Sequence, residues 1–170
     1  MVYLERTPNI SSTMLRSSSF NITKVGLVGT GRIAERFVAE ARYASGLIVT
    51  SAYNPDIESV NQFKKNCSEY EIDIYTDKYD EFLEKVDAVY IASTHATHYK
   101  YAKVALKQGK HVLCEKPLAF TKKESIELYN LAKNQGVVLM EAIKAAYCPG
   151  FQQLLNVVPV SYTHLTLPTT

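Results

Sequence analysis

Two glycines and an alanine follow a short apolar run at a spacing that suits dinucleotide binding. They stand as Gly29-x-Gly31-x-x-Ala34, after Val25–Val28 and at the start of an amphipathic segment. The first glycine permits a tight turn, the second lets a pyrophosphate approach the backbone, and the alanine lets a helix pack closely on the strand. The start of that helix would offer unpaired N–H groups and its positive dipole end to phosphates. The alternative is a glycine-rich turn without a ligand.

The residues of this turn are candidate cofactor-binding residues: Gly29, Thr30, Gly31, Arg32 and Ile33. About 20 residues further on, a dinucleotide site usually places an acidic residue for the adenosine ribose or an arginine for a 2′-phosphate. Asn54 stands there, and its amide can both donate to and accept from ribose hydroxyls. No Lys or Arg lies beside it, so NAD is slightly favoured over NADP. Asn54, followed by Pro55, could also cap the next helix.

Hydroxyl and imidazole groups are concentrated in STHATH, residues 93–98, which follows the apolar run Ala88–Ala92. Such a run predicts a strand covered on both faces. We expect a polar loop from Ser93 to Thr97 and a helix from His98. If the strand is the fourth of a parallel sheet, this loop lies beside the crevice at the switch point. Its candidate cofactor-binding residues are Ser93, Thr94, His95 and His98.

Glu115, Lys116 and Pro117 follow the β-rich run His111–Cys114. An adjacent Glu and Lys are most often a solvated pair. After a buried strand, and with a proline that fixes the turn, both are expected at the crevice rim. A lysine there can hold a ribose or substrate hydroxyl, and its charge can lower the barrier to proton removal. Lys116 is the candidate catalytic residue, and Glu115 and Lys116 are candidate cofactor-binding residues.

One alternating pattern of strands and helices places all these groups. The expected strands are Val25–Val28, Leu47–Ala52, Ile72–Tyr75, Ala88–Ala92, His111–Cys114 and Val137–Met140. The expected helices are Arg32–Ala44, one after Pro55, Tyr79–Lys85, His98–Gln108, and one to Asn134 that the capping box Thr121–Glu124 opens. Short connections and right-handed crossovers predict an α/β fold, a Rossmann-like doubly wound parallel sheet of order 3-2-1-4-5-6.

The amino-acid composition argues against several other classes of protein. Apolar residues make up 46% of the 170 residues, enough for a packed core, and the net charge of +2 favours neither nucleic acid nor an acidic membrane as partner. Cys67, Cys114 and Cys148 are odd in number and far apart. This argues against a metal or disulfide framework and favours reduced thiols in a cytoplasmic protein. No apolar run has the length of a membrane span.

Taken together, the motifs resemble those of the Gfo/Idh/MocA oxidoreductases. Four segments match in order over about residues 22–155: GLVGTGRIA, DAVYIASTHATHYKYAKVAL, GKHVLCEKPLA and VVLMEAIKAAYCPGF. The resemblance implies that Lys116 contacts the nicotinamide ribose and takes part in catalysis, and that Glu115 lines the cofactor site. It implies an often cis Lys116–Pro117 bond, and it matches His98 to the family's histidine after the fourth strand.

Two departures from the family pattern matter. Thr94 stands where many members have proline, and Asn54 replaces the more diagnostic acidic residue or arginine, so NAD and NADP both stay open. The family joins this domain to a C-terminal α/β domain that supplies the substrate pocket, usually an Asp and a His for acid/base chemistry, and commonly the oligomer interface. The resemblance therefore implies hydride transfer between nicotinamide C4 and a hydroxyl-bearing carbon, often of a sugar or cyclitol, in a homo-oligomer.

Both ends of the chain are expected to lie outside this domain. Residues 1–21 are polar, lack the apolar core of a secretory signal and are expected to be a flexible extension. Residues 22–145 are expected to form the NAD(P)-binding domain, and residues 146–158 to begin the second one. Residues 159–170 are similar to a translated transposase sequencing adapter, whose bases CTGTCTCTTATACACATCT encode VSYTH in one frame. We therefore expect a non-native tail on a truncated protein that binds cofactor without turnover and leaves bare the apolar face where the second domain would pack.

Two alternatives stay open. A non-catalytic nicotinamide sensor can use the same fold to control a partner, but it does not need the lysine of GKHVLCEKP. Other two-domain reductases, similar to homoserine dehydrogenase or dihydrodipicolinate reductase, lack that segment. The substrate itself is not predicted, because its pocket belongs to the second domain.

Overall fold

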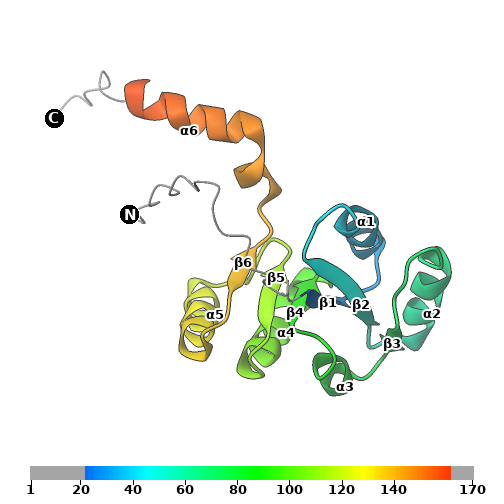
Figure 1. The fold of residues 1–170 in the computed structure, drawn as a ribbon. Coiled ribbons are helices and arrows are strands. Elements are labelled where there is room, and N and C mark those ends of the chain that lie inside the picture. Colours follow the sequence, from blue (N-terminus) through cyan, green and yellow to red (C-terminus); the bar gives the residue numbers. More distant parts are fainter. Residues whose placement is uncertain (1–21, 162–170) are drawn as a thin grey trace, which may run out of the picture.

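The computed structural model describes residues 22–161, which form an α/β domain with one helix projecting from it (Figure 1). The strands are β1 (Thr23–Val28), β2 (Leu47–Tyr53), β3 (Ile74–Thr76), β4 (Ala88–Ile91), β5 (His111–Cys114) and β6 (Leu139–Glu141). The helices are α1 (Arg32–Ala41), α2 (Ile57–Asn66), α3 (Tyr79–Leu83), α4 (His95–Lys107), α5 (Lys122–Gln135) and α6 (Pro149–Ser161), with the 3-10 helix η1 (Lys144–Tyr147) before α6. The six strands are parallel and lie in the order β3-β2-β1-β4-β5-β6, which confirms the predicted doubly wound topology.

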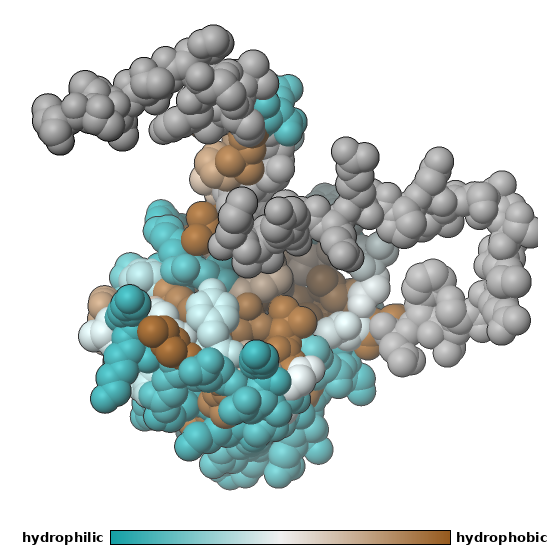
Figure 2. All heavy atoms as spheres, turned by 90° about the vertical axis from the view of Figure 1, so that its left-hand side faces the viewer, coloured by the Kyte–Doolittle hydropathy of each residue, from teal (hydrophilic) through white to brown (hydrophobic). Residues whose placement is uncertain are grey.

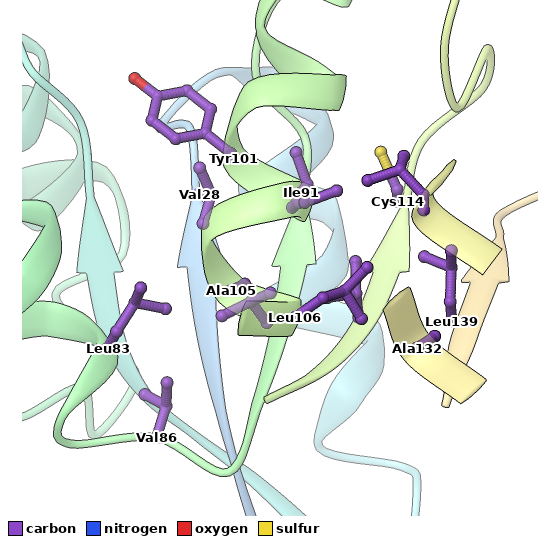
Figure 3. Packing of buried hydrophobic residues seen from close by; sticks show 14 of the residues in the cluster. Val28, Leu83, Val86, Ile91, Tyr101, Ala105, Leu106, Cys114, Ala132 and Leu139 are labelled. Carbon is purple, nitrogen blue, oxygen red and sulfur yellow. The ribbon is translucent and has the colours of Figure 1, made fainter. Parts of the chain in front are cut away.

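Each face of the sheet has its own hydrophobic core, because successive side chains of a strand point to opposite faces. Leu27 packs in the core beneath α1 and α2, whereas its neighbour Val28 packs in the core beneath α3, α4 and α5. Figure 3 shows part of the second core, whose side chains include Val28 of β1, Ile91 of β4 and Leu106 of α4. Each of these three side chains is fully buried, which stabilises the fold by roughly 1.5–3 kcal/mol apiece.

Part of the sheet face that carries α1 and α2 is left uncovered, over β5 and β6. An apolar groove of about 240 Å³ lies there, and its lining includes Phe37, Leu113, Val138 and Met140. Val138 and Met140 are 52% and 39% exposed. Figure 2 shows hydrophobic side chains gathered within a mostly hydrophilic surround on the side of the molecule that carries β6 and α5. The predicted bare apolar face is present, and the packing of a second domain on it stays a prediction.

Two helix starts differ from the sequence prediction. Helix α4 begins at His95 rather than His98, because Thr94 takes the extended backbone of a cap and the Thr97 hydroxyl donates to Thr94 O at 2.7 Å. The polar groups of this first helical turn thus bond to one another. The sequence prediction placed a loop here because so many polar residues stand together. Helix α2 is capped by Asp56, not by Asn54. The capping box of α5 at Thr121 is confirmed.

Smaller differences concern element ends. Helix α1 ends at Ala41, three residues before the predicted end, and the third and sixth strands start two residues later than predicted. Such shifts are common because local patterns define the middle of an element better than its ends. Residues 1–21 and 162–170, on which the predicted extension and most of the predicted tail fall, lie outside the described residues. Pro159–Ser161 continue α6. None of the described helices is long and apolar enough to cross a bilayer.

Candidate functional site

The turn between β1 and α1 has the geometry that its glycines indicate. Gly29 has a φ of 101°, and an added Cβ would lie 2.6 Å from the carbonyl oxygen of Ala92, so the position requires glycine. A Cβ on Gly31 would meet no atom within 4 Å. Gly31 is also the cap of α1 and offers no side-chain bond to the first N–H groups of the helix. These residues fit a pyrophosphate, because the approach is open and the N–H groups there have no side-chain acceptor.

A cavity of about 400 Å³ lies on one side of this turn, between the ends of β2 and β4 and the start of α4. We call it the Asn54 cavity. Its lining includes six predicted cofactor-binding residues: Gly29, Thr30, Gly31, Asn54, Ser93 and Thr94. Asn54 Nδ2 donates to Thr30 Oγ1 at 2.8 Å, and Asn54 Oδ1 accepts from the backbone N–H of Asp56 at 3.0 Å. The asparagine is therefore fixed against the glycine turn.

Two tyrosines that the sequence analysis did not select also line the Asn54 cavity. The hydroxyls of Tyr53 and Tyr101 lie 3.4 Å apart, and their rings make an edge contact. Tyr79 supports them from α3, because its hydroxyl donates to Tyr101 O at 3.0 Å. Figure 3 shows the Tyr101 ring above the end of β1, near Val28. The alternation of side chains along β2 could have identified Tyr53, because it places Tyr53 on the same face of the sheet as Val28.

A second cavity, of about 360 Å³, lies on the other side of the turn, and we call it the Lys116 cavity. Its lining includes Ile33, in the first turn of α1, together with Glu115 and Lys116. The other lining residues come from α1, β4 and the segment after β6: Arg36, Phe37, Glu40, Tyr90, Ala142, Ile143, Lys144 and Ala145. The structure thus divides the single predicted crevice into two cavities, with the predicted site residues distributed between them.

Side chains from three elements hold the segment around Lys116. From β4, the Tyr90 hydroxyl donates to Glu115 Oε1 at 2.7 Å, and burial together with this bond raises the Tyr90 pKa far above its usual value. From α4, His98 Nδ1 lies 2.8 Å from the carbonyl oxygen of Pro117. From β6, Glu141 Oε1 accepts from Leu118 N–H at 2.8 Å. The Lys116–Pro117 peptide bond is cis.

Three of the predicted site residues line neither cavity. His98 is fully buried, and its Nε2 lies 3.1 Å from the carbonyl oxygen of Ser93 while its Nδ1 faces Pro117 O. It therefore joins the loop of one cavity to the loop of the other. His95 and Arg32 are exposed, and the His95 ring lies 5.4 Å from that of His98. Within residues 22–161, no three His, Cys, Asp or Glu side chains come together as a metal site.

The family model of oxidoreductases described as "NAD-binding Rossmann fold" matches residues 23–143. The chain belongs to the Gfo/Idh/MocA oxidoreductase family. This assignment and the sheet order agree with the fold and cofactor class predicted from the sequence, which is NAD or NADP. No choice between the two cofactors follows from family membership.

Individual members of the family are similar to the chain over part of their length. The chain is 37% identical over 133 residues to scyllo-inositol 2-dehydrogenase (NADP(+)) of Bacillus subtilis, covering 77% of this chain and 40% of that protein. It is 35% identical over 116 residues to 1,5-anhydro-D-fructose reductase of Ensifer adhaerens, covering 67% of this chain and 34% of that protein. The crystal structure of a 3-ketoreductase from Actinomadura kijaniata with NADP superposes with a TM-score of 0.73 at 26% identity, over 82% of this chain and 44% of that one. The chain thus spans about two fifths of the length of such relatives.

Proposed function

We propose that this chain is the cofactor-binding part of a dehydrogenase or reductase that moves a hydride between nicotinamide C4 and a hydroxyl-bearing carbon of a sugar, cyclitol or related polyol. The observation that carries the proposal is the pair of cavities on either side of one glycine turn. A dinucleotide has two halves joined by a pyrophosphate, and the turn fits that pyrophosphate. The polyol relatives and the NADP-containing neighbour support the substrate and cofactor class.

In this proposal each cavity has its own role. The Asn54 cavity holds adenosine between the β2 end and α4, and Thr30, Ser93 and Thr94 supply hydroxyls there. The Lys116 cavity holds the nicotinamide riboside. The bound nicotinamide supplies or accepts the hydride, and its own chemistry belongs to the cofactor. Lys116 is exposed at the end of β5 and places a positive charge where a substrate oxygen loses its proton.

The 170-residue chain provides the first test. NADH or NADPH fluorescence should change on titration into the folded chain, because both cavities and the turn are present. Folded material that binds neither cofactor would contradict the proposal. The same chain should show no turnover of polyols, since the acid/base residues and substrate pocket are expected in a second domain.

A protein that includes the second domain provides the second test. Lys116→Ala should lower turnover at least a hundredfold, roughly the loss seen when one charge-stabilising group is removed, and leave most of the cofactor affinity. Lys144→Ala is the matched control, because Lys144, the first residue of η1, also lines this cavity. A Lys116→Ala protein with unchanged turnover would instead favour a cofactor sensor.

A further inference from the structure

The loop that carries Lys116, residues 115–117, is bonded at both of its ends to the end of β6. Before the loop, the carbonyl oxygen of Cys114 accepts from the N–H of Ala142 at 2.8 Å. After the loop, the N–H of Leu118 donates to Glu141 Oε1 at 2.8 Å. Two consecutive residues of one segment therefore close the loop, one through its backbone and one through its side chain.

Only the second of these bonds depends on the type of a side chain. Leu118 is 3% exposed, and its side chain packs in the core beneath α3, α4 and α5. Its N–H has little access to water, and a buried N–H that loses its acceptor is costly. Glu141 is half-buried, and no salt bridge among the described residues includes it. Its part in the loop is that of a hydrogen-bond acceptor, which an amide oxygen can also play.

The segment after Glu141 also belongs to the wall of the Lys116 cavity. The chain continues through Ala142, Ile143 and Lys144, which line the cavity together with Lys116. From there η1 leads to α6, towards the expected second domain. The two bonds therefore fix the loop of Lys116 relative to the segment that leads to that domain.

We propose that Glu141 is a positioning residue for Lys116, because its bond to the Leu118 N–H holds the loop in place beside the nicotinamide half of the cofactor. The inference rests on the proposed function. Glu141 differs from His98, which joins the loops of both cavities, because its bond reaches the loop of Lys116. A misplacement of about 1 Å can cost about a hundredfold in rate, so the loss of one such bond is measurable.

The first test is isothermal titration of the 170-residue chain with ADP-ribose and with NADH or NADPH, whichever binds the unmodified chain more tightly. Glu141→Ala and Glu141→Leu both remove the acceptor, and leucine keeps most of the volume. In both variants, affinity for the reduced cofactor should fall about fivefold while affinity for ADP-ribose stays within about twofold. Glu141→Gln keeps an acceptor oxygen, so both affinities should stay within about twofold. A general loss of stability would not separate the two ligands in this way.

The second test uses a protein that includes the second domain. Glu141→Ala should lower kcat about tenfold and change the KM for the polyol less than about threefold, and Glu141→Gln should bring kcat back to within about threefold. Met140→Ala is the matched control on the same strand, because Met140 lines the apolar groove and not the Lys116 cavity. It should leave kcat and the ratio of the two affinities unchanged.

Three results would overturn the inference. They are an unchanged ratio of affinities in both the alanine and the leucine variant, an unchanged kcat in Glu141→Ala, and a Glu141→Gln protein as impaired as Glu141→Ala. If the alanine and leucine variants failed to fold while Glu141→Gln folded, Glu141 would be a residue of the fold, which would also overturn it. Binding of neither NADH nor NADPH by the folded, unmodified chain would instead overturn the proposed function itself.

Discussion

The two cavities beside the glycine turn are similar in volume but differ in charge. The Asn54 cavity is lined by hydroxyl, amide and aromatic groups, and none of its described lining residues is charged. The lining of the Lys116 cavity includes five acidic or basic residues: Arg36, Glu40, Glu115, Lys116 and Lys144. A neutral cavity suits a base and a ribose, whereas charge is useful where a bond is made or broken. Under the proposed function, the Asn54 cavity is the binding side and the Lys116 cavity is the chemical side.

The two sides are also held in place differently. The Asn54 cavity is fixed by bonds such as that between Asn54 and Thr30 within its wall, and by Tyr79 of α3, which bonds to Tyr101. The segment around Lys116 is fixed from outside, by side chains of β4, α4 and β6. Within the described residues, the Lys116 ammonium takes part in no salt bridge. A rigid backbone with an uncommitted ammonium suits a group that must meet a substrate.

The largest effect is expected at the glycine turn, which lines the Asn54 cavity and leads into α1, a helix that lines the Lys116 cavity. Gly29→Ala forces a Cβ to within 2.6 Å of Ala92 O at a φ of 101°. We expect a loss of about 4 kcal/mol of unfolding free energy, combining a strained backbone of about 1–3 kcal/mol with overpacking of similar size. Denaturant unfolding followed by circular dichroism measures this loss.

Gly31→Ala is the matched control for this substitution. Its Cβ meets no protein atom within 4 Å, so stability should change by less than about 1 kcal/mol. Binding of NADH and NADPH should nevertheless be lost, because the methyl group stands where the pyrophosphate approaches. Equal destabilisation by the two substitutions would contradict the different roles of the two glycines.

Sequence patterns were sufficient for the sheet because each strand is a short apolar run between turn signals. They also located the turn, since Gly29 has few backbone alternatives. They could not divide the crevice in two, because the division depends on how α1 and α4 pack at the sheet edge. The start of α4 was misplaced and Tyr101 was missed because each local pattern fits two interpretations. A polar helical turn resembles a loop, and a tyrosine that is both core and cavity wall looks like core.

The cap of α2 illustrates a different limit. Asn54, Asp56 and Ser59 are all good hydrogen-bonding residues close together in sequence. Asp56 caps the helix, whereas the Asn54 amide bonds to Thr30, 24 residues away, and to the N–H of Asp56. A local pattern contains no information about such a partner.

The next largest effect is expected at His98, which links the two sides. His98→Ala removes a fully buried ring and its contacts with the carbonyl oxygens of Ser93 and Pro117. We expect a loss of about 2–3 kcal/mol in unfolding free energy. Affinity for NADH and for ADP-ribose should fall together, since the loops of both cavities move.

His95→Ala provides the control on the same helix. This side chain is exposed, so its removal should change stability by less than about 0.5 kcal/mol. If His98→Ala lowered the affinity for NADH but not for ADP-ribose, His98 would position only the loop of the Lys116 cavity. That result would contradict the interpretation that His98 links the loops of the two cavities.

The smallest effect is expected from two hydroxyl deletions, which separate the cavities most sharply. Tyr90→Phe removes the donor to Glu115 in the Lys116 cavity, and Tyr101→Phe removes a hydroxyl from the Asn54 cavity. Each substitution removes one hydrogen bond within a cavity wall, usually worth about 1 kcal/mol of stability, and we expect affinity for the cofactor to fall by no more than about fivefold. Tyr90→Phe should lower the affinity for NADH but not for ADP-ribose, which lacks the nicotinamide. Tyr101→Phe should lower the affinity for both ligands equally. Isothermal titration with the two ligands measures the difference, and a Tyr90→Phe chain that lost ADP-ribose affinity as well would show that the two cavities act as one.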